Sequence, residues 1–243
     1  MILKVDLHIH TCISPCGSLE MSPSAIVAEL KKNKIDAAAI TDHNSALNCP
    51  AFADVCKKEG IWGMFGIEVT SMEEAHILCI FETPEAALDF GEFIYKNLPD
   101  IPNKPETFGD QVYVDSEDNI VGEVEKFLGN ATLLSIDAIR DEALSRSAFF
   151  IPAHVDKPIF SIPSQLGFLP DDKYTSIEVF NPKNSNDYES KYSVVTSSDA
   201  HFLDDIGKKY FTVDLAEKSF LSLALALGEK GSLIKELDFY PYF

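Results

Sequence analysis

The sequence KVDLHIH, residues 4–10, alternates apolar and polar side chains and places His8 and His10 two positions apart. Residues two apart in a β-strand point to the same face of a sheet. Two imidazoles on one face can bind the same cation without distorting the backbone. The stretch therefore predicts an N-terminal strand that ends in a metal site.

Similar short apolar runs recur along the chain, and most of them border polar residues. They are DAAAITDH from Asp36, WGMFGIEVTS from Trp62, HILCIF from His76, AFFIPAH from Ala148, SIEVFN from Ser176, SVVTSSDAH from Ser193 and YFTVDL from Tyr210. Helical patterns separate them at about 23–34, 51–59, 84–98, 132–146 and 217–230. This alternation predicts an α/β fold with a mostly parallel sheet. Because many strands deliver polar residues to one edge, a barrel is favoured over an open sheet.

The length of the chain fits one domain. Its 243 residues, of which 46% are apolar, are enough for one large core, so we expect a single domain over residues 1–243. The segment at about 100–146 is longer than a simple connection and contains a hairpin pattern around 115–119. We expect this insertion near the mouth of the site, where it sets substrate choice or acts as a structural cap or dimer contact.

Composition narrows the classes of partner. A net charge of −19 repels phosphate backbones, so long nucleic acids are unlikely partners. A small phosphorylated substrate remains compatible, because bound cations would dominate the local field. The longest apolar run, 220–227, is too short to cross a membrane. The five cysteines show no disulfide spacing, which favours a cytoplasmic location, and the oligomeric state is left open.

The six histidines are informative as a set, because a single buried histidine is more often a hydrogen-bonded core residue than a ligand. Each lies at the end or start of an apolar run: His8, His10, His43, His76, His154 and His201. Glu68 lies inside an apolar run, where an unpaired carboxylate would be costly, and Asp199 precedes His201. Imidazoles and carboxylates are ligands for zinc, manganese or iron. Their number predicts two or three divalent ions, bridged by Glu68 or Asp199.

The ordered series DLHIHT, TDHN, GIEVT, HILCIF, AHVDKP and SSDAH resembles the successive motifs of the PHP (polymerase and histidinol phosphatase) superfamily. The match runs from about Lys4 to His201, and the motifs are specific only when taken together. The resemblance implies a distorted (β/α)7 TIM-like barrel of PHP type with an inserted segment. It also implies a centre of two or three metal ions that hydrolyses phosphoesters.

The resemblance further implies a role for each ligand. His8, His10, Glu68 and Asp199 resemble the ligands of a first metal, Glu68, His76 and His154 those of a second, and His43 and His201 those of a third. Family members often place a His or Asp soon after the first motif, whereas this chain has Ser14-Pro15-Cys16-Gly17. Either Cys16 is a thiolate ligand, which would favour softer ions, or the third site is weaker or open.

Cations in such a centre lower the pKa of water and neutralise phosphoryl oxygens, so the remaining need is a proton for the leaving group. We expect His201 or Asp42 to supply it. Lys157, three residues after His154, is either a phosphate contact or a solvated loop lysine.

The leading hypothesis is a metal-dependent phosphoesterase acting on a small phosphorylated metabolite or nucleotide. Within the same class, a histidinol-phosphate phosphatase and an exonuclease on short oligonucleotides are alternatives. The charge and the lack of an aromatic-plus-basic pattern weigh against the exonuclease. An amidohydrolase would use the same metal chemistry on a carbonyl, and a metal-binding module without turnover is the alternative outside enzymes.

Overall fold

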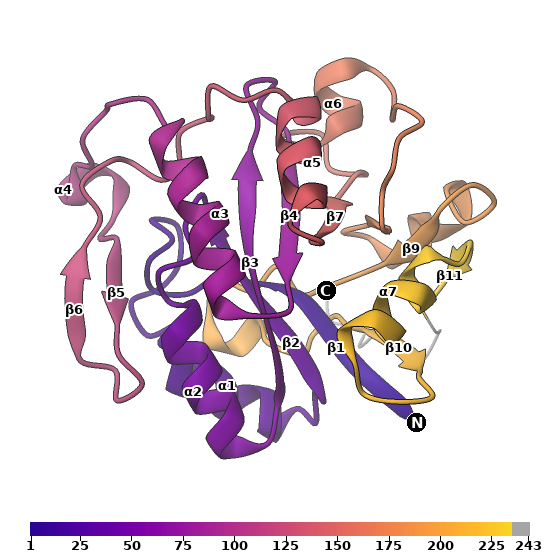
Figure 1. The fold of residues 1–243 in the computed structure, drawn as a ribbon, viewed down its shortest axis with the longest axis horizontal. Coiled ribbons are helices and arrows are strands. Elements are labelled where there is room, and N and C mark those ends of the chain that lie inside the picture. The colour runs from indigo at the N-terminus through magenta and orange to yellow at the C-terminus, as the bar shows by residue number, and fades with distance from the viewer. Residues whose placement is uncertain (235–243) are drawn as a thin grey trace.

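A computed structural model describes residues 1–234 and shows a mixed α/β fold (Figure 1). The main sheet contains β1 (Ile2–Ile9), β2 (Ala37–His43), β3 (Trp62–Thr70), β4 (His76–Phe81), β7 (Phe149–Pro152) and β10 (Phe211–Asp214). A second sheet contains β8 (Ile177–Glu178), β9 (Ser193–Val195) and β11 (Gly231–Ser232), while β5 (Val112–Val114) pairs with β6 (Ile120–Glu123). The helices are α1 (Pro23–Lys32), α2 (Cys49–Glu59), α3 (Pro84–Lys96), α4 (Pro105–Phe108), α5 (Ile136–Ser145), α6 (Ile162–Leu166) and α7 (Phe220–Gly228), and two 3-10 helices span Pro182–Asp187 and Leu203–Asp205. Each predicted strand and helix therefore has a counterpart, although SIEVFN and SVVTSSDAH contain only short strands.

The main sheet has the strand order β10-β1-β2-β3-β4-β7. Strands β1, β2 and β3 pair in parallel, but β10 is antiparallel to β1, and β4 is antiparallel to both β3 and β7, so the prediction of a mostly parallel sheet is wrong for the main sheet. The turn at 71–75 between β3 and β4 is too short for a crossover, so the chain returns as a hairpin. As a result the first residue of β4 lies at the edge where β1, β2 and β3 end.

Hydrogen bonds also link the main sheet to the second sheet. At the β7 margin the Val155 amide donates to the Glu178 carbonyl at 2.8 Å, and at the β10 margin the Thr212 amide donates to the Leu233 carbonyl, directly after β11, at 3.3 Å. The curled main sheet therefore meets the second sheet at both of its margins. A complete (β/α)7 barrel remains a prediction.

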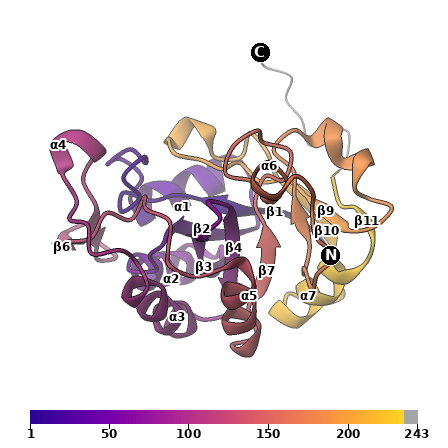
Figure 2. The ribbon, with the colours of Figure 1, turned by 90° about the horizontal axis from the view of Figure 1, so that it is seen from above.

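The two faces of the main sheet pack against different clusters. On the outer face, helices α1, α2, α3 and α5 cover a cluster that includes Ile26, Phe52, Phe90 and Ile139 (Figure 2). The inner face and α7 share a second cluster that includes Leu7, Ala39, Met64, Ile80 and Leu223. Because neighbouring residues in a strand alternate between faces, each polar residue near a strand end is directed to one face or the other.

A bulge in β1 turns its two histidines toward the inner face. Leu7 belongs to the inner cluster, yet Ile9, two residues later, belongs to the outer cluster. The register with β2 shifts between Asp6 and Ile9, which places one extra residue in β1 and reverses the alternation. His8 and His10 therefore project inward.

The segment at 100–146 contains α4, the β5–β6 hairpin predicted around 115–119, and α5. It packs against the loops that follow β1 and β2. The Val114 amide donates to Asn48 Oδ1 at 2.9 Å, and Asn44 Nδ2 donates to the Leu128 carbonyl at 2.7 Å. The insertion therefore supports these loops from outside.

Neither a membrane span nor a disulfide occurs among the described residues. No helix within residues 1–234 combines the length and the apolar character needed to cross a bilayer. All five cysteines are free thiols, of which Cys16 alone is exposed. The absence of a disulfide framework agrees with the cysteine spacing.

Gly66 allows β3 to pack closely against its neighbours. A Cβ atom there would lie 2.7 Å from the Cys79 carbonyl oxygen and 3.0 Å from Thr41 Cγ2. We expect Gly66→Ala to lower the free energy of unfolding by about 1–3 kcal/mol because the crowded strands must move apart. Urea denaturation measures this change. Gly228→Ala is the control, because a Cβ at that position meets nothing within 4 Å; equal stability of the two variants would contradict the packing.

Candidate metal centre

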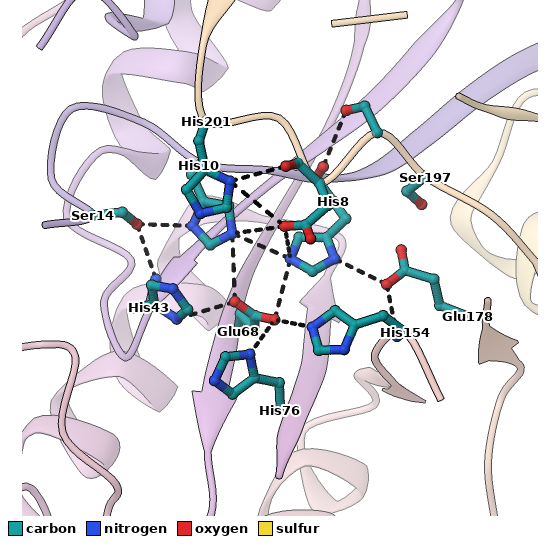
Figure 3. A network of polar contacts seen from close by, with 12 residues as sticks. His8, His10, Ser14, His43, Glu68, His76, His154, Glu178, Ser197 and His201 are labelled. Atoms are coloured by element: carbon teal, nitrogen blue, oxygen red, sulfur yellow. Dashed lines mark hydrogen bonds and ion pairs between the residues drawn. The ribbon is translucent and has the colours of Figure 1, made fainter. Parts of the chain in front are cut away.

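The predicted ligand residues converge at one edge of the curled sheet (Figure 3). They come from β1 (His8), the residue directly after it (His10), the end of β2 (His43), β3 (Glu68), the start of β4 (His76), and the segments after β7 (His154) and β9 (Asp199, His201). His76 joins the group because it pairs with Thr70, near the end of β3. The structure thus brings together side chains that lie up to 193 positions apart in the sequence.

Glu68 lies at the middle of this cluster and is only 1% exposed. Its Oε1 atom is 2.9 Å from His76 Nδ1, 3.2 Å from His154 Nε2 and 3.3 Å from His8 Nε2, and its Oε2 atom is 3.0 Å from His43 Nδ1 and 3.4 Å from His10 Nε2. Two carboxylate oxygens thus share five imidazoles. Such crowding suits a carboxylate that bridges cations more than one that merely accepts hydrogen bonds.

The geometry around His8 and His10 fits a divalent ion. Their Nε2 atoms lie 3.2 Å apart, and they are 3.3 Å and 3.4 Å from Asp199 Oδ1. Ligand atoms that hold one ion tetrahedrally at roughly 2.1 Å lie roughly 3.4 Å from one another. The spacing of the two nitrogens and the carboxylate oxygen is therefore that of a shared metal ligand set.

Hydrogen bonds on the far sides of these rings orient their nitrogens. His8 Nδ1 lies 3.0 Å from Glu178 Oε2, and His10 Nδ1 lies 3.0 Å from Ser14 Oγ. Ser14 Oγ donates its hydrogen to Asp42 Oδ1 at 2.7 Å, so it accepts from His10. With Nδ1 of each ring acting as a donor, the Nε2 lone pairs can point into the centre once each ring is neutral.

Glu178 is a site residue that the sequence reasoning missed. It is 2% exposed, and its Oε2 atom also accepts from the His154 amide at 3.0 Å. It therefore fixes both a ring and a backbone segment of the centre. The signal was present, because Glu178 lies in the apolar run SIEVFN just as Glu68 lies in FGIEVT.

Asp42 lies outside the centre, contrary to the proton-donor role expected for it. It alternates with His43 along β2 and therefore points to the opposite face. It is 1% exposed and accepts from the Thr11 amide at 2.6 Å and from Thr11 Oγ1 at 2.8 Å. Burial raises the pKa of Asp42 to about 6. Its contacts with Thr11 and Ser14 make it a support for the loop that follows β1.

A cavity of about 240 Å³ opens onto the cluster. Its wall is formed by Cys16, His43, Glu68, His76, His154, Lys157, Ile159, Phe160, Asp199 and His201. No residue of the 100–146 segment contributes to this wall, so its position gives no support to the expected role in substrate choice. Most of the predicted ligands do face the cavity, as a reacting centre requires.

Lys157 and Cys16 both lie at this cavity. Lys157 Nζ is 2.5 Å from Asp199 Oδ2, so it is not a freely solvated loop lysine. Cys16 Sγ forms a group with nitrogen atoms of His10, His43 and His201 in which all ligand atoms lie within 4.8 Å of one another. Burial raises the pKa of the Cys16 thiol to about 12, so formation of a thiolate near neutral pH would need a bound cation.

Charges in the cluster favour the binding of cations. Burial lowers the pKa of His10 to about 4 and that of His43 well below its usual value, so both rings are neutral at pH 7. Burial also opposes ionisation of Glu68 and Asp199, but nearby imidazoles, His76 and His8 foremost, hold both pKa values well below the usual range. Burial opposes protonation of His8, but Glu178, Asp199 and Glu68 hold its pKa well above the usual value, so His8 must lose a proton when a cation binds there.

We expect Glu178→Gln to lower metal affinity by about 10- to 100-fold, because an amide orients His8 less firmly than a carboxylate. Titration with Zn²⁺ against a competing chelator measures the affinity. Glu82→Gln, on the exposed surface before α3, is the matched control and should bind as the wild type does. Equal affinity of the Glu178 variant and the wild type would show that this carboxylate does not support the centre.

Comparison with known proteins agrees with this geometry. The family model of the PHP domain matches residues 6–175. No curated protein matches the chain significantly.

Solved structures share the fold at low sequence identity. The lesion-specific endonuclease of Pyrococcus furiosus has 18% identity and a TM-score of 0.65 over 93% of this chain, which spans 56% of the endonuclease, or about half of its length. A candidate metal-dependent phosphoesterase from Bifidobacterium adolescentis has 18% identity and a TM-score of 0.55 over 81% of this chain and 87% of its own. An amidohydrolase from Chromobacterium violaceum has 13% identity and a TM-score of 0.57 over 93% of this chain and 97% of its own. Because the family model covers more than half of the sequence, the resemblance is confirmed, and the chain belongs to the PHP domain family.

Proposed function

We propose that this protein is a metal-dependent phosphoesterase whose centre holds two or three divalent transition metal ions, zinc, manganese or iron. The observation that carries the proposal is the buried Glu68 carboxylate among five imidazoles, which is the arrangement of a bridging ligand. The two sheets would together form the distorted barrel of the family, since hydrogen bonds join both of their margins.

The proposed ligands divide into three groups that share members. His8, His10, Glu68 and Asp199 would hold one ion, Glu68, His76 and His154 a second, and His43 and His201, with Cys16, a third. The carboxylate of Glu68 contacts imidazoles of both the first group and the second group, which supports its role as a bridge. The third group contains a thiol, which would favour zinc or iron over manganese at that position.

Cations in such a centre lower the pKa of water and neutralise the charge that develops on a phosphoryl group. The residues of the chain would supply the remaining functions. Lys157 Nζ, beside Asp199 at the cavity wall, would contact a phosphoryl oxygen. His201 has the most exposed of the six imidazoles, at 25%, so it is better placed than Asp42 to hold a proton near the leaving group.

The cavity supports a small phosphorylated metabolite or nucleotide as substrate. At about 240 Å³ it holds a phosphoryl group and the atoms next to it. The net charge of −19 opposes an extended nucleic acid. A nucleic acid is a second candidate, because a structure of Endonuclease Q with a TM-score of 0.66 contains duplex DNA with an abasic lesion at its active site.

Metal removal and reconstitution test the proposed activity. Treatment with a chelator should abolish phosphate release from p-nitrophenyl phosphate and from glycerol phosphate. Addition of Mn²⁺, Fe²⁺ or Zn²⁺ should restore it, because the hydrolysis depends on cations held by the cluster. A purified protein that binds none of these metals, or that releases no phosphate with any of them, would rule out the proposal.

His76→Ala tests the second group of ligands. His76 is at the cavity wall with a side chain only 12% exposed, and loss of its ring removes the 2.9 Å contact with Glu68. We expect a fall in turnover larger than the roughly 10- to 100-fold loss that follows substitution of a residue hydrogen-bonded to a metal ligand. Steady-state kinetics, metal analysis and circular dichroism on one preparation separate this from misfolding. Unchanged turnover would show that the second group is misplaced.

A further inference from the structure

Phe160 is an exposed aromatic residue at the wall of the catalytic cavity. Its ring stacks on that of His76, with centroids 4.8 Å apart and planes 7° from parallel. The residue nevertheless remains 41% exposed, and its neighbour Ile159 is 59% exposed. Both residues line the cavity, so they place an apolar surface directly beside the proposed metal ligands.

The backbone of Phe160 is strained. Its φ angle of +55° lies in the left-handed region, which a bulky side chain seldom adopts. The Phe160 carbonyl accepts a hydrogen bond from the His76 amide at 2.9 Å, which holds the residue in place. Strained residues of this kind concentrate at sites of ligand binding, and here the strain directs an aromatic ring to the cavity instead of the core.

Positive charge lies beside the same cavity. Lys157 Nζ is 4.6 Å and Lys209 Nζ is 3.4 Å from the centroid of the Phe180 ring, and Lys157 also contacts Asp199. Of the two lysines, only Lys157 lines the cavity wall. Its ammonium group would favour an anion, such as a phosphate, at this side of the centre.

We propose that Phe160 is a stacking platform that selects phosphoesters carrying a planar aromatic ring, nucleotides among them. The proposal rests on the proposed phosphoesterase function and names the substrate class of the same site. One face of the Phe160 ring is occupied by His76, and the exposed part offers the flat apolar surface on which a substrate ring stacks. Nucleotides and histidinol phosphate both carry an aromatic ring and a phosphate, so the experiment includes one compound of each kind.

The test compares kinetic constants for adenosine 5′-monophosphate, histidinol phosphate and glycerol phosphate, which has no ring. Phe160→Ala and Phe160→Gly remove the platform, and glycine also accepts the positive φ without strain. Stacking of a base on an aromatic side chain corresponds to roughly 5- to 150-fold in affinity, so we expect KM for the preferred ring substrate to rise by that factor. Phe160→Tyr should keep the KM for the ring substrate. In Phe160→Ala and Phe160→Gly the ratio of kcat/KM for the ring substrate to kcat/KM for glycerol phosphate should fall by the same factor.

Phe108→Ala is the matched control. Phe108 is 39% exposed and stacks on Phe127, with centroids 4.2 Å apart, but it lies outside the cavity wall. Its variant should show wild-type constants for every substrate. A comparison of kcat/KM of the wild type for adenosine 5′-monophosphate and for histidinol phosphate shows whether the site prefers a nucleobase or an imidazole ring.

Two results would overturn the inference while leaving the proposed function intact. In the first, kcat/KM of the wild type for glycerol phosphate equals that for the ring compounds. In the second, the Phe160 variants lose bound metal, or their kcat falls by the same factor for all three substrates. Either outcome would mean that the ring only positions His76. A wild type that hydrolyses none of them rejects the proposed function instead. Calorimetric binding of adenosine 5′-monophosphate that weakens in Phe160→Gly would then still support the platform, and binding that does not weaken would reject it.

Discussion

One buried carboxylate sets the requirements for the rest of this structure. Glu68 is 1% exposed in the middle of a β-strand, and an isolated charge there would be strongly destabilising. Its oxygens are instead surrounded by five imidazoles that arrive from β1, β2, β4 and the segment after β7. The curl of the sheet, the bulge in β1 and the reversal of β4 all serve to bring these rings to Glu68.

Strained backbone accompanies the centre. His154 has a φ of +31°, Asp199 of +53° and Phe160 of +55°, although none of them is glycine. Conformations of this kind cost about 1–3 kcal/mol each and persist only where the surrounding structure enforces them. Here hydrogen bonds hold two of these residues: the His154 amide donates to Glu178 Oε2 at 3.0 Å, and the Phe160 carbonyl accepts from the His76 amide at 2.9 Å. The fold thus stabilises one proposed ligand and one cavity residue in positions that they would not adopt by themselves.

Hydrogen bonds from residues outside the centre orient the proposed ligands. Ser14 links His10 to Asp42, and Glu178 links His8 to the His154 amide. Sequence reasoning considered Asp42, besides His201, as the proton donor, but Asp42 alternates with His43 along β2 and points to the opposite face. It overlooked Glu178, although this carboxylate lies in the apolar run SIEVFN just as Glu68 lies in FGIEVT.

The sequence by itself determined the succession of strands and helices, the set of histidines and carboxylates, and the family, because these depend on local periodicity and on the order of short motifs. Only the tertiary structure decided which faces the side chains take. The extra residue in β1 directs His8 and His10 inward, and the hairpin places His76 beside Thr70. It also placed Phe160 on the wall of the cavity, to which the 100–146 segment contributes no residue. Such features depend on contacts between residues far apart in the chain, which local patterns do not encode.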